Sequence, residues 1–457
     1  MKRIKRTPDL VNGPLIPQII SFVLPLMATS ILQLLYNTAD IVVVGRYAGS
    51  QALAAVGATS ALIALLTNVF LGLSVGTNVV VARYLGAGEY DRVSRSVHAS
   101  IALSLVCSLT VGMIGVAGSP YFLHWMGTPE DVIDLAVLYM RIYFCGTPGS
   151  LLYNFGAAIL RAKGDTRRPL LILTATGLLN VVLNLVFVIC FNMSVDGVAL
   201  STIISQYLSA AAVLFCLMRE ESTIRLHVKE IRFHPKELRA VLQVGVPAGF
   251  QSAMFAISNV LIQSSLNTFG SAAVAGAAAG NSIESFVYMP INAFFQASMT
   301  FTSQNMGAKN YKRVPKILAA CMALAVGVSL VGTAITLLFN RPLLTIFNSD
   351  PLVLDYGVRR QIMLMAPYVL LAIMEVFSGQ LRGMGYSMTP TVICLFFVCV
   401  LRVIWLYTVF AIWPLFEVLM SVYGVTWLLT DIVLLICYCV AVKKLPKGDA
   451  IYENQPS

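Results

Sequence analysis

Long apolar runs, separated by short polar segments, follow one another along nearly the whole chain. An apolar run of about 18 residues or more with few or no charges is long enough to cross a bilayer as an α-helix. Twelve runs meet this description, and the pattern predicts an all-α integral membrane protein with twelve transmembrane helices. The predicted spans are Ile16–Arg46, Ala52–Leu85, Val93–Gly118, Asp131–Leu160, Pro169–Phe191, Val198–Met218, Leu238–Phe269, Ala272–Asn305, Val314–Phe339, Val353–Leu381, Thr389–Ile412 and Val418–Val442.

Charge separates the two sides of this predicted membrane protein. Only 11% of the residues are charged, yet the formal net charge is +10. Most Lys and Arg residues lie in alternate segments between spans, and the N-terminal stretch Lys2–Arg6 and the polar stretch Arg219–Lys236 are examples. Basic residues concentrate on the cytoplasmic side of membrane proteins. We therefore expect both termini in the cytoplasm, and we attribute the basic excess to cytoplasmic loops rather than to nucleic-acid binding. Arg359 and Arg360 are among the few basic residues predicted near the outer face.

The two halves of the chain repeat each other. Gly86–Val93 resembles Gly307–Val314, and Leu160–Gly164 resembles Leu381–Gly385, both at an offset of 221 residues (307 − 86). Several matches at one offset indicate an internal duplication. We predict an N-lobe (1–218), a cytoplasmic linker (219–236) and a C-lobe (237–457).

Six spans per lobe give both lobes the same orientation. This arrangement predicts a pseudo-two-fold axis along the membrane normal, with a site and a rocking motion between the lobes. Pro25 and Pro247 match with a slip of one residue and are the candidate hinges. A fixed helix kink is the equal alternative.

Asp40 is the first candidate for chemistry, because an ionisable side chain within a span is costly and is a functional candidate by default. Gln33, Tyr36 and Asn37 precede it at helical spacing and share its face. Amide and phenol groups can hydrogen-bond a carboxyl group in either protonation state. The alternative is an aspartate that only fixes helix packing.

Asn180 and Asn184 lie one helical turn apart in an apolar span, and Thr202 lies in the next span. Their oxygens would supply ligands to a small cation. Hydrogen bonding between helices is the alternative and is equally consistent with the pattern.

The C-lobe has no equivalent of Asp40, since the offset leads to Leu261. Glu284, close to Asn281, and Glu375 lie within C-lobe spans instead. Either glutamate, with Gln33 and Asn281, is a candidate to bind a cationic substrate or a second coupling ion. Each would otherwise pair with an arginine inside a span, and the two candidates for that role are Arg141 and Arg402.

Motifs for other chemistry are missing from the sequence. The chain has no GxxxxGK[ST] phosphate loop, no HExxH and no GxSxG, so neither an ATP-driven pump nor a membrane enzyme is indicated. Its nine Cys and four His residues form no ligand pattern for a metal, and no cofactor is expected.

Taken together, these features resemble the multidrug and toxic compound extrusion (MATE) family, nearest to its DinF-like bacterial branch. The motifs that carry the resemblance are Tyr36–Asp40, Gln304–Ala308 and the Leu-Arg-x-x-Gly turns at Leu160 and Leu381. The resemblance implies a monomeric antiporter in a bacterial cytoplasmic membrane, which exports small organic cations in exchange for H⁺ or Na⁺.

The resemblance also implies roles for individual residues. Asp40 would be the coupling carboxylate, and Asn180, Asn184 and Thr202 would help to form a cation site. Relatives often have Asp at the position of Asn184, and this difference favours H⁺ over Na⁺. Two other functions stay open, a lipid-linked saccharide flippase of the same superfamily and a membrane scaffold without a transport cycle. Intramembrane acids favour a cationic substrate over the flippase, and Asp40 argues against the scaffold.

Overall fold

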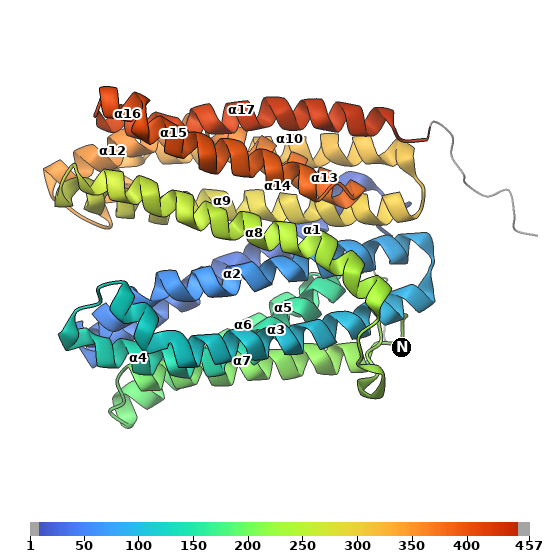
Figure 1. Cartoon of the computed structure of the whole chain (residues 1–457), viewed down its shortest axis with the longest axis horizontal. Helices are drawn as coiled ribbons and strands as arrows, with labels where there is room; N and C mark the ends of the chain where they lie inside the picture. The colour runs from blue at the N-terminus through green and yellow to red at the C-terminus, as the bar shows by residue number, and fades with distance from the viewer. Residues whose placement is uncertain (1–8, 447–457) are drawn as a thin grey trace, which may run out of the picture. The chain divides into compact units, whose positions relative to one another are not determined.

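The structure, a computed structural model, describes residues 9–446, and these form helices and turns without a β-strand. The basic residues predicted at the cytoplasmic N-terminus and Lys447 lie outside this range. Figure 1 shows the order of the helices along the chain. They are α1 (Leu15–Val43), α2 (Ser50–Ala87), α3 (Tyr90–Trp125), α4 (Glu130–Cys145), α5 (Thr147–Ala162), α6 (Arg167–Leu185), α7 (Val195–Met218), α8 (Pro235–Asn267), α9 (Ser271–Gly307), α10 (Val314–Leu338), α11 (Asn340–Thr345), α12 (Pro351–Met365), α13 (Tyr368–Met384), α14 (Met388–Cys394), α15 (Leu401–Tyr407), α16 (Val409–Ile412) and α17 (Phe416–Lys443).

Three π-helical segments interrupt or extend these helices. Val44–Ala48 extends α1, Val186–Cys190 extends α6, and Leu395–Val400 joins α14 to α15. Short 3₁₀ turns lie at Val228–Glu230 and Tyr311–Arg313. Each of the twelve predicted spans therefore falls on a helix, on such an extended helix, on a pair of helices or, for Thr389–Ile412, on the series from α14 to α16.

Within the described residues, nine helical stretches are long and apolar enough to cross a membrane singly, and two bent pairs raise the number to eleven. The pairs are α4 with α5, bent by 44°, and α12 with α13, bent by 46°. Gly146 and Pro367 lie at the two breaks, and both residue types interrupt helices. The remaining predicted span is α9, a helix of 37 residues with a polar stripe that lowers its hydropathy. The twelve-helix prediction is confirmed in this form.

The described chain forms two compact units. The first contains Pro25–Gly249, and the second contains Asp9–Leu24 together with residues 250–446. The first part of α1 thus belongs to the second unit, and the first part of α8 belongs to the first. Pro25 and Pro247 lie inside these two helices. Pro25 is the first residue of the first unit, and Pro247 lies two residues before its last residue, Gly249. Their role as hinges stays a prediction, as do the lobe boundaries and the symmetry axis.

Backbone geometry within each unit repeats as the sequence does. Positive φ angles occur at Gly49 (93°) and Gly270 (90°), at Gly164 (95°) and Gly385 (101°), and at Gly88 (69°) and Lys309 (57°). All three pairs have the offset of 221 residues. Glycine reaches this left-handed region without steric cost. At Lys309 the inherited turn keeps its shape although the glycine has been replaced.

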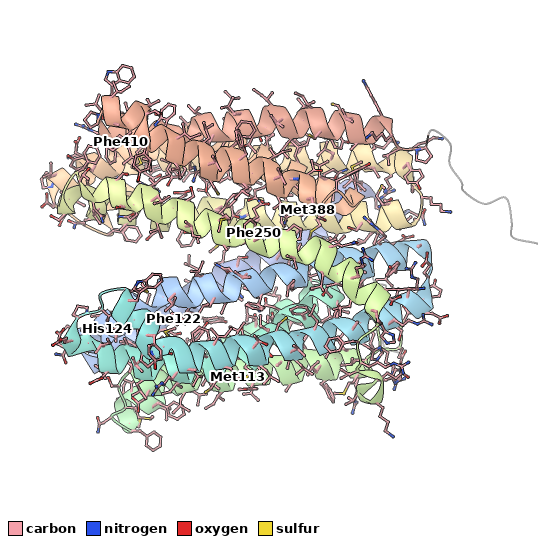
Figure 2. The ribbon with its side chains drawn as sticks, in the orientation of Figure 1. Met113, Phe122, His124, Phe250, Met388 and Phe410 are labelled. Carbon is pink, nitrogen blue, oxygen red and sulfur yellow. The ribbon has the colours of Figure 1, made fainter. Side chains whose placement is uncertain are left out.

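Apolar side chains cover much of the helix surfaces, as Figure 2 shows. Met113 on α3 and Phe250 on α8 are 66% and 48% exposed. In water such surfaces would be costly, whereas lipid tails accommodate them. The core of each unit is also apolar, and in the second unit Tyr368 and Trp427 pack edge to face with ring centroids 5.8 Å apart.

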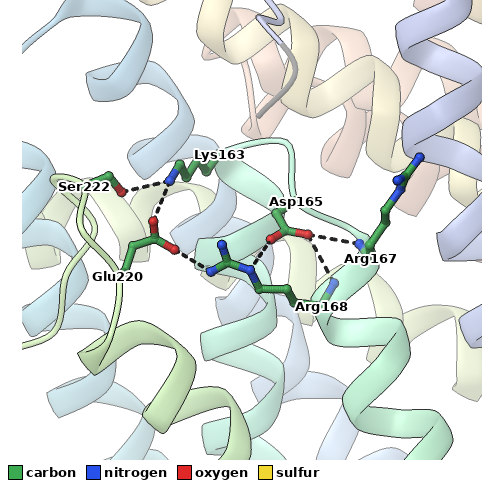
Figure 3. A network of polar contacts seen from close by, with 6 residues as sticks. All are labelled: Lys163, Asp165, Arg167, Arg168, Glu220 and Ser222. Atoms are coloured by element: carbon green, nitrogen blue, oxygen red, sulfur yellow. Dashed lines mark hydrogen bonds and ion pairs between the residues drawn. The ribbon is translucent and has the colours of Figure 1, made fainter. Parts of the chain in front are cut away.

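A network of charges ties the end of the first unit's helices to the following linker (Figure 3). The Glu220 carboxylate accepts hydrogen bonds from Lys163 Nζ at 2.8 Å and from Arg168 Nη1. Lys163 also donates to Ser222 Oγ at 3.0 Å, and Arg168 Nε lies 2.9 Å from Asp165 Oδ2. Burial alone would raise the pKa of Glu220, but the bonds from Lys163 and Arg168 hold that pKa below its usual value.

Candidate functional site

Asp40 lies near the C-terminal end of α1, half-buried within the first unit. The Asn184 amide on α6 donates a hydrogen bond from Nδ2 to Asp40 Oδ1. Asn184 Oδ1 in turn accepts a hydrogen bond from the Ser201 hydroxyl on α7. Asn184 and Ser201 are completely buried. Three helices therefore hold one carboxyl group through a short polar chain.

Other predicted residues lie near this chain without joining it. Asn180 is buried one turn before Asn184, and within residues 9–446 its side chain makes no hydrogen bond. The Thr202 hydroxyl donates to the carbonyl of Val198 on its own helix at 2.9 Å. The structure thus brings Asp40 together with Asn184, while neither Asn180 nor Thr202 hydrogen-bonds to the carboxylate within residues 9–446.

Tyr36 crosses to α6, where its hydroxyl donates to the Thr174 carbonyl at 3.2 Å. Gly177 lies directly under the ring, and a Cβ there would come within 1.9 Å of a ring carbon of Tyr36. Gln33 and Asn37 are exposed. The expected cage of one phenol and two amides from α1 itself is therefore not formed, because the polar partner of Asp40 comes from another helix.

Two features of the first unit escaped the sequence reasoning. The first feature is Ser201, which the sequence prediction did not include. Ser201, Ser205 and Ser209 recur every fourth residue on α7 and are all buried. A spacing of four residues places the three serines on one face of the helix, and this pattern is the signal in the sequence that identifies Ser201. The second feature is a pair of α4 tyrosines, Tyr139 and Tyr143, which lie close enough to interact electrostatically with Asp40.

In the second unit, Glu284 on α9 pairs with Arg360 on α12, with Oε2 and Nη2 2.8 Å apart. The same guanidinium donates to Asn281 Oδ1. The alternative to a functional role for Glu284 was an ion pair with Arg402 or Arg141. Glu284 forms its ion pair with Arg360 instead, and Arg402 lies close enough to interact with it electrostatically. Arg360, which is predicted to lie near the outer face, is only 5% exposed. Adjacent helical residues point about 100° apart, so Arg359 faces outward while Arg360 faces inward.

Glu375 on α13 accepts a hydrogen bond from the Tyr288 hydroxyl at 3.3 Å. Asn292 and Gln296 continue the chain along α9, with the Gln296 amide donating to Asn292 Oδ1 at 3.0 Å. Tyr288, Asn292 and Gln296 are spaced four residues apart and form the polar stripe of this helix. Glu375 is thus hydrogen-bonded by a phenol, and Arg382 lies close enough to interact with it electrostatically.

The two arginines predicted inside spans have different surroundings. Arg402 is buried, donates to Asn259 Oδ1 at 3.3 Å and stacks over the Tyr423 ring at 4.3 Å. Arg141 is exposed and donates to the Val116 carbonyl at 3.3 Å.

One buried acid was missed altogether. Asp431 on α17 is 7% exposed, and neither carboxylate oxygen has a hydrogen-bond partner among the described residues. The signal was present, since Asp431 lies in the middle of the predicted span Val418–Val442. A search of the described residues finds no group of three or more Cys, His, Asp or Glu side chains that could hold a metal ion.

Known proteins share this sequence pattern and fold. The family model MatE matches twice, at residues 25–186 and 247–408, in agreement with the internal repeat. A probable multidrug resistance protein of Bacillus subtilis, YpnP, is 28% identical over 86% of this chain and 88% of its own length. The probable multidrug resistance protein NorM of Thermotoga maritima is 25% identical over 82% of each chain.

Solved structures show the same architecture. A MOP superfamily transporter from Pyrococcus furiosus, described as having a binding pocket of reversed polarity, superposes with a TM-score of 0.90. It is 22% identical, and the match covers 97% of this chain and all of that one. This likeness shows the fold. The two matches to the family model cover most of the chain, and the protein therefore belongs to the MatE family of multidrug and toxic compound extrusion transporters and is not an enzyme.

Proposed function

We propose that this transporter exports organic cations in exchange for protons and that Asp40 carries the exchanged proton. The observation that carries the proposal is the chain from Asp40 through Asn184 to Ser201. It holds a half-buried carboxyl group inside a membrane-spanning unit, where an ionisable side chain is expensive to keep without a function.

The direction of the hydrogen bonds favours H⁺ over Na⁺. Asn184 turns its NH₂ group toward Asp40, and its oxygen is already engaged by Ser201. A sodium ion needs oxygen ligands around it. Binding of Na⁺ would therefore require the amide to rotate and Ser201 to change partner, and Thr202 would have to leave its bond to Val198. Proton binding at the free oxygen of Asp40 requires none of these changes.

The setting of the protein is part of the same proposal. The apolar helices and their charge distribution support a place in a bacterial cytoplasmic membrane with both termini in the cytoplasm, and we propose that the protein acts there as a monomer. The relatives named as multidrug resistance proteins support a broad range of small substrates.

The test is export of a fluorescent organic cation from proteoliposomes under an imposed pH gradient without sodium. Wild type is compared with Asp40→Asn, and Asp134→Asn, an exposed acid of α4, is the matched control. We expect flux in wild type and in the control, and flux near background in Asp40→Asn. Full flux in Asp40→Asn would remove Asp40 from the mechanism.

Two further outcomes would change the proposal. Flux only under a sodium gradient would establish Na⁺ as the coupling ion. No flux under either gradient would favour transport of a lipid-linked saccharide instead.

A further inference from the structure

His98 is buried near the start of α3 and connects this helix to the linker between α7 and α8. The residue is 1% exposed. Its Nδ1 lies 2.7 Å from the carbonyl oxygen of Ser94, one turn earlier on the same helix. Its Nε2 accepts a hydrogen bond of 3.0 Å from the backbone N–H of His227, which lies 129 residues further along the chain. Both nitrogens of one buried ring are therefore engaged, and one of them holds the linker.

These two partners decide which ring nitrogen of His98 carries the hydrogen. A backbone N–H can only donate, so Nε2 must be unprotonated where it meets His227. A backbone carbonyl can only accept, so Nδ1 must carry a hydrogen where it meets Ser94. The observed contacts therefore require the neutral imidazole with its hydrogen on Nδ1.

A proton on Nε2 of His98 is incompatible with this arrangement. The new N–H would point at the N–H of His227, and two donors cannot form a hydrogen bond. The charged ring would also be buried, and a buried charge is costly unless it is paired and hydrogen-bonded. An acceptor lies close by, because Glu230 Oε2 is 3.9 Å from Nε2 and belongs to the same linker, three residues after His227.

The linker has a fixed part and an exposed part, and the bond to His98 lies between them. Ile224 and Leu226 are buried in the apolar core of the unit, and the Leu226 N–H donates to the Leu217 carbonyl at 3.1 Å. The turn Val228–Glu230 that follows is exposed. The bond from His227 to His98 is therefore the point where the exposed turn is attached to α3.

A cavity of about 300 Å³ lies beside His98, between α3 and the linker. It gives the Glu230 carboxylate space to approach the ring. The charged and titratable groups that line it with His98 are Asp91, Arg95, Glu230, Arg232 and His234. Two acids balance two arginines in this set. Burial and the charge of Arg232 lower the pKa of His234, so this second histidine takes up a proton at a lower pH than an ordinary one.

The remaining titratable groups near this end of α3 have partners of their own. The ring of His227 is stacked on that of His98, with the centroids 6.2 Å apart. On α8, Glu237 Oε1 lies 3.7 Å from Arg92 Nε, and on α2 the ring of Tyr84 lies under the same guanidinium. On α5, the Tyr153 hydroxyl donates to the Pro169 carbonyl. Glu230 is therefore the acid that a charged His98 would meet.

We propose that His98 is a proton-binding site that controls the attachment of the linker to α3. Uptake of one proton at Nε2 breaks the hydrogen bond from His227, and the imidazolium then pairs with the Glu230 carboxylate. The N–H of His227 is released to water, while Nδ1 keeps its bond to Ser94. The linker thus has two positions on α3, one for each protonation state of a single ring. It continues into α8, the helix whose first part belongs to the first unit and whose last part belongs to the second.

The test is hydrogen–deuterium exchange of the full-length protein in detergent between about pH 8 and about pH 5, the range in which histidine ordinarily changes charge. After correction for the intrinsic effect of pH on exchange, the His227 amide should lose about tenfold of its protection at low pH, the size of one hydrogen bond. The Leu226 amide is the internal control and should keep its protection, because it bonds to the Leu217 carbonyl. Equal protection of His227 across the range would overturn the proposal.

His98→Gln separates proton binding from packing. A glutamine amide offers one acceptor and one donor and does not titrate, so His227 should stay protected at every pH in this variant. His234→Gln is the matched control, since His234 lines the same cavity, and it should keep the response of wild type. A response that survives in His98→Gln and disappears in His234→Gln would assign the proton to the wrong histidine.

Glu230→Gln tests the second position of the linker and alters only an exposed side chain. Release of His227 should require a lower pH in this variant, because the imidazolium loses its partner. Release at the pH of wild type would refute the pairing with Glu230. This measurement and the wild-type experiment remain decisive if His98→Gln does not fold. Exchange is read without substrate or an ion gradient, so the result does not depend on the proposed antiport.

Discussion

Replacing Gly72 by alanine tests a close helix crossing in the first unit. Gly72 and Gly76 of α2 face Gly245 and Gly249 of α8 there. A Cβ at Gly72 would lie 2.2 Å from the backbone nitrogen of Gly249 and 2.3 Å from its Cα, whereas ordinary contact begins near 3.4 Å. Small residues allow helix backbones in membranes to approach this closely.

The expected change in the free energy of unfolding follows from these distances. The two helices would have to separate by about 1 Å at the crossing, because both clashing groups are backbone and neither can rotate away. Overpacking of this kind costs about 1–3 kcal/mol. Alanine returns roughly 0.5–1 kcal/mol through its better helix propensity. We therefore expect Gly72→Ala to lower the free energy of unfolding by roughly 2 kcal/mol, at the upper end of this range because the contact is backbone against backbone.

Gly57 on the same helix provides the control, since a Cβ there meets no atom within 4 Å. Gly57→Ala should stabilise the protein by roughly 0.5–1 kcal/mol. Tryptophan fluorescence during heating in one detergent gives the apparent unfolding temperature of each variant, and the two should shift in opposite directions. If Gly72→Ala unfolded no earlier than Gly57→Ala, the argument from close backbone packing would be refuted.

Two other predictions concern hydrogen bonds. Ser201→Ala leaves the amide oxygen of Asn184 unpaired and should reduce proton-driven export about tenfold. Thr202→Ala should have little effect on export, because the Thr202 hydroxyl bonds only to the carbonyl of Val198. The measurement is the initial rate of export from proteoliposomes, and a larger loss in Thr202→Ala than in Ser201→Ala would support a sodium site. Glu220→Gln should cost roughly 2 kcal/mol of stability at pH 7. Because the folded-state pKa of Glu220 is depressed, this contribution is present above its unfolded pKa of about 4.3 and disappears as the pH falls through the lower folded value. Unfolding temperatures of both proteins from pH 7 downward should converge in acid, and a constant difference would contradict the network of charges.

Much of the fold could be predicted because membrane burial leaves a local signal. Every span must be apolar along its length, so the runs appear in the sequence without knowledge of their neighbours. The apolar signal is weaker in α9, because this helix packs polar side chains against its neighbours. α9 carries the stripe Tyr288, Asn292 and Gln296, whose partners are each other and Glu375, and it is therefore less apolar than a helix surrounded by lipid.

The candidate site was only partly accessible from sequence. Asp40 could be identified alone, because a carboxyl group within an apolar run is costly wherever its helix packs. Its partner could not, since Asn184 lies 144 residues away and only the packing of α6 against α1 selects it over Asn180. Asp431 carries the same local signal as Asp40, a carboxyl group in the middle of an apolar run, and its burial follows the same rule.

The sequence by itself determined the helical class, the spans, the internal repeat and the presence of intramembrane acids. These properties depend on the composition of single segments and on the match between two of them. Only the tertiary structure decided which charges are neutralised. Arg359 and Arg360 are neighbours in the chain, yet one pairs at the surface with Asp355 and Glu417 and the other with buried Glu284. Helix rotation and packing set that difference, because the strength of an ion pair depends on distance and burial, and neither quantity is a property of one segment.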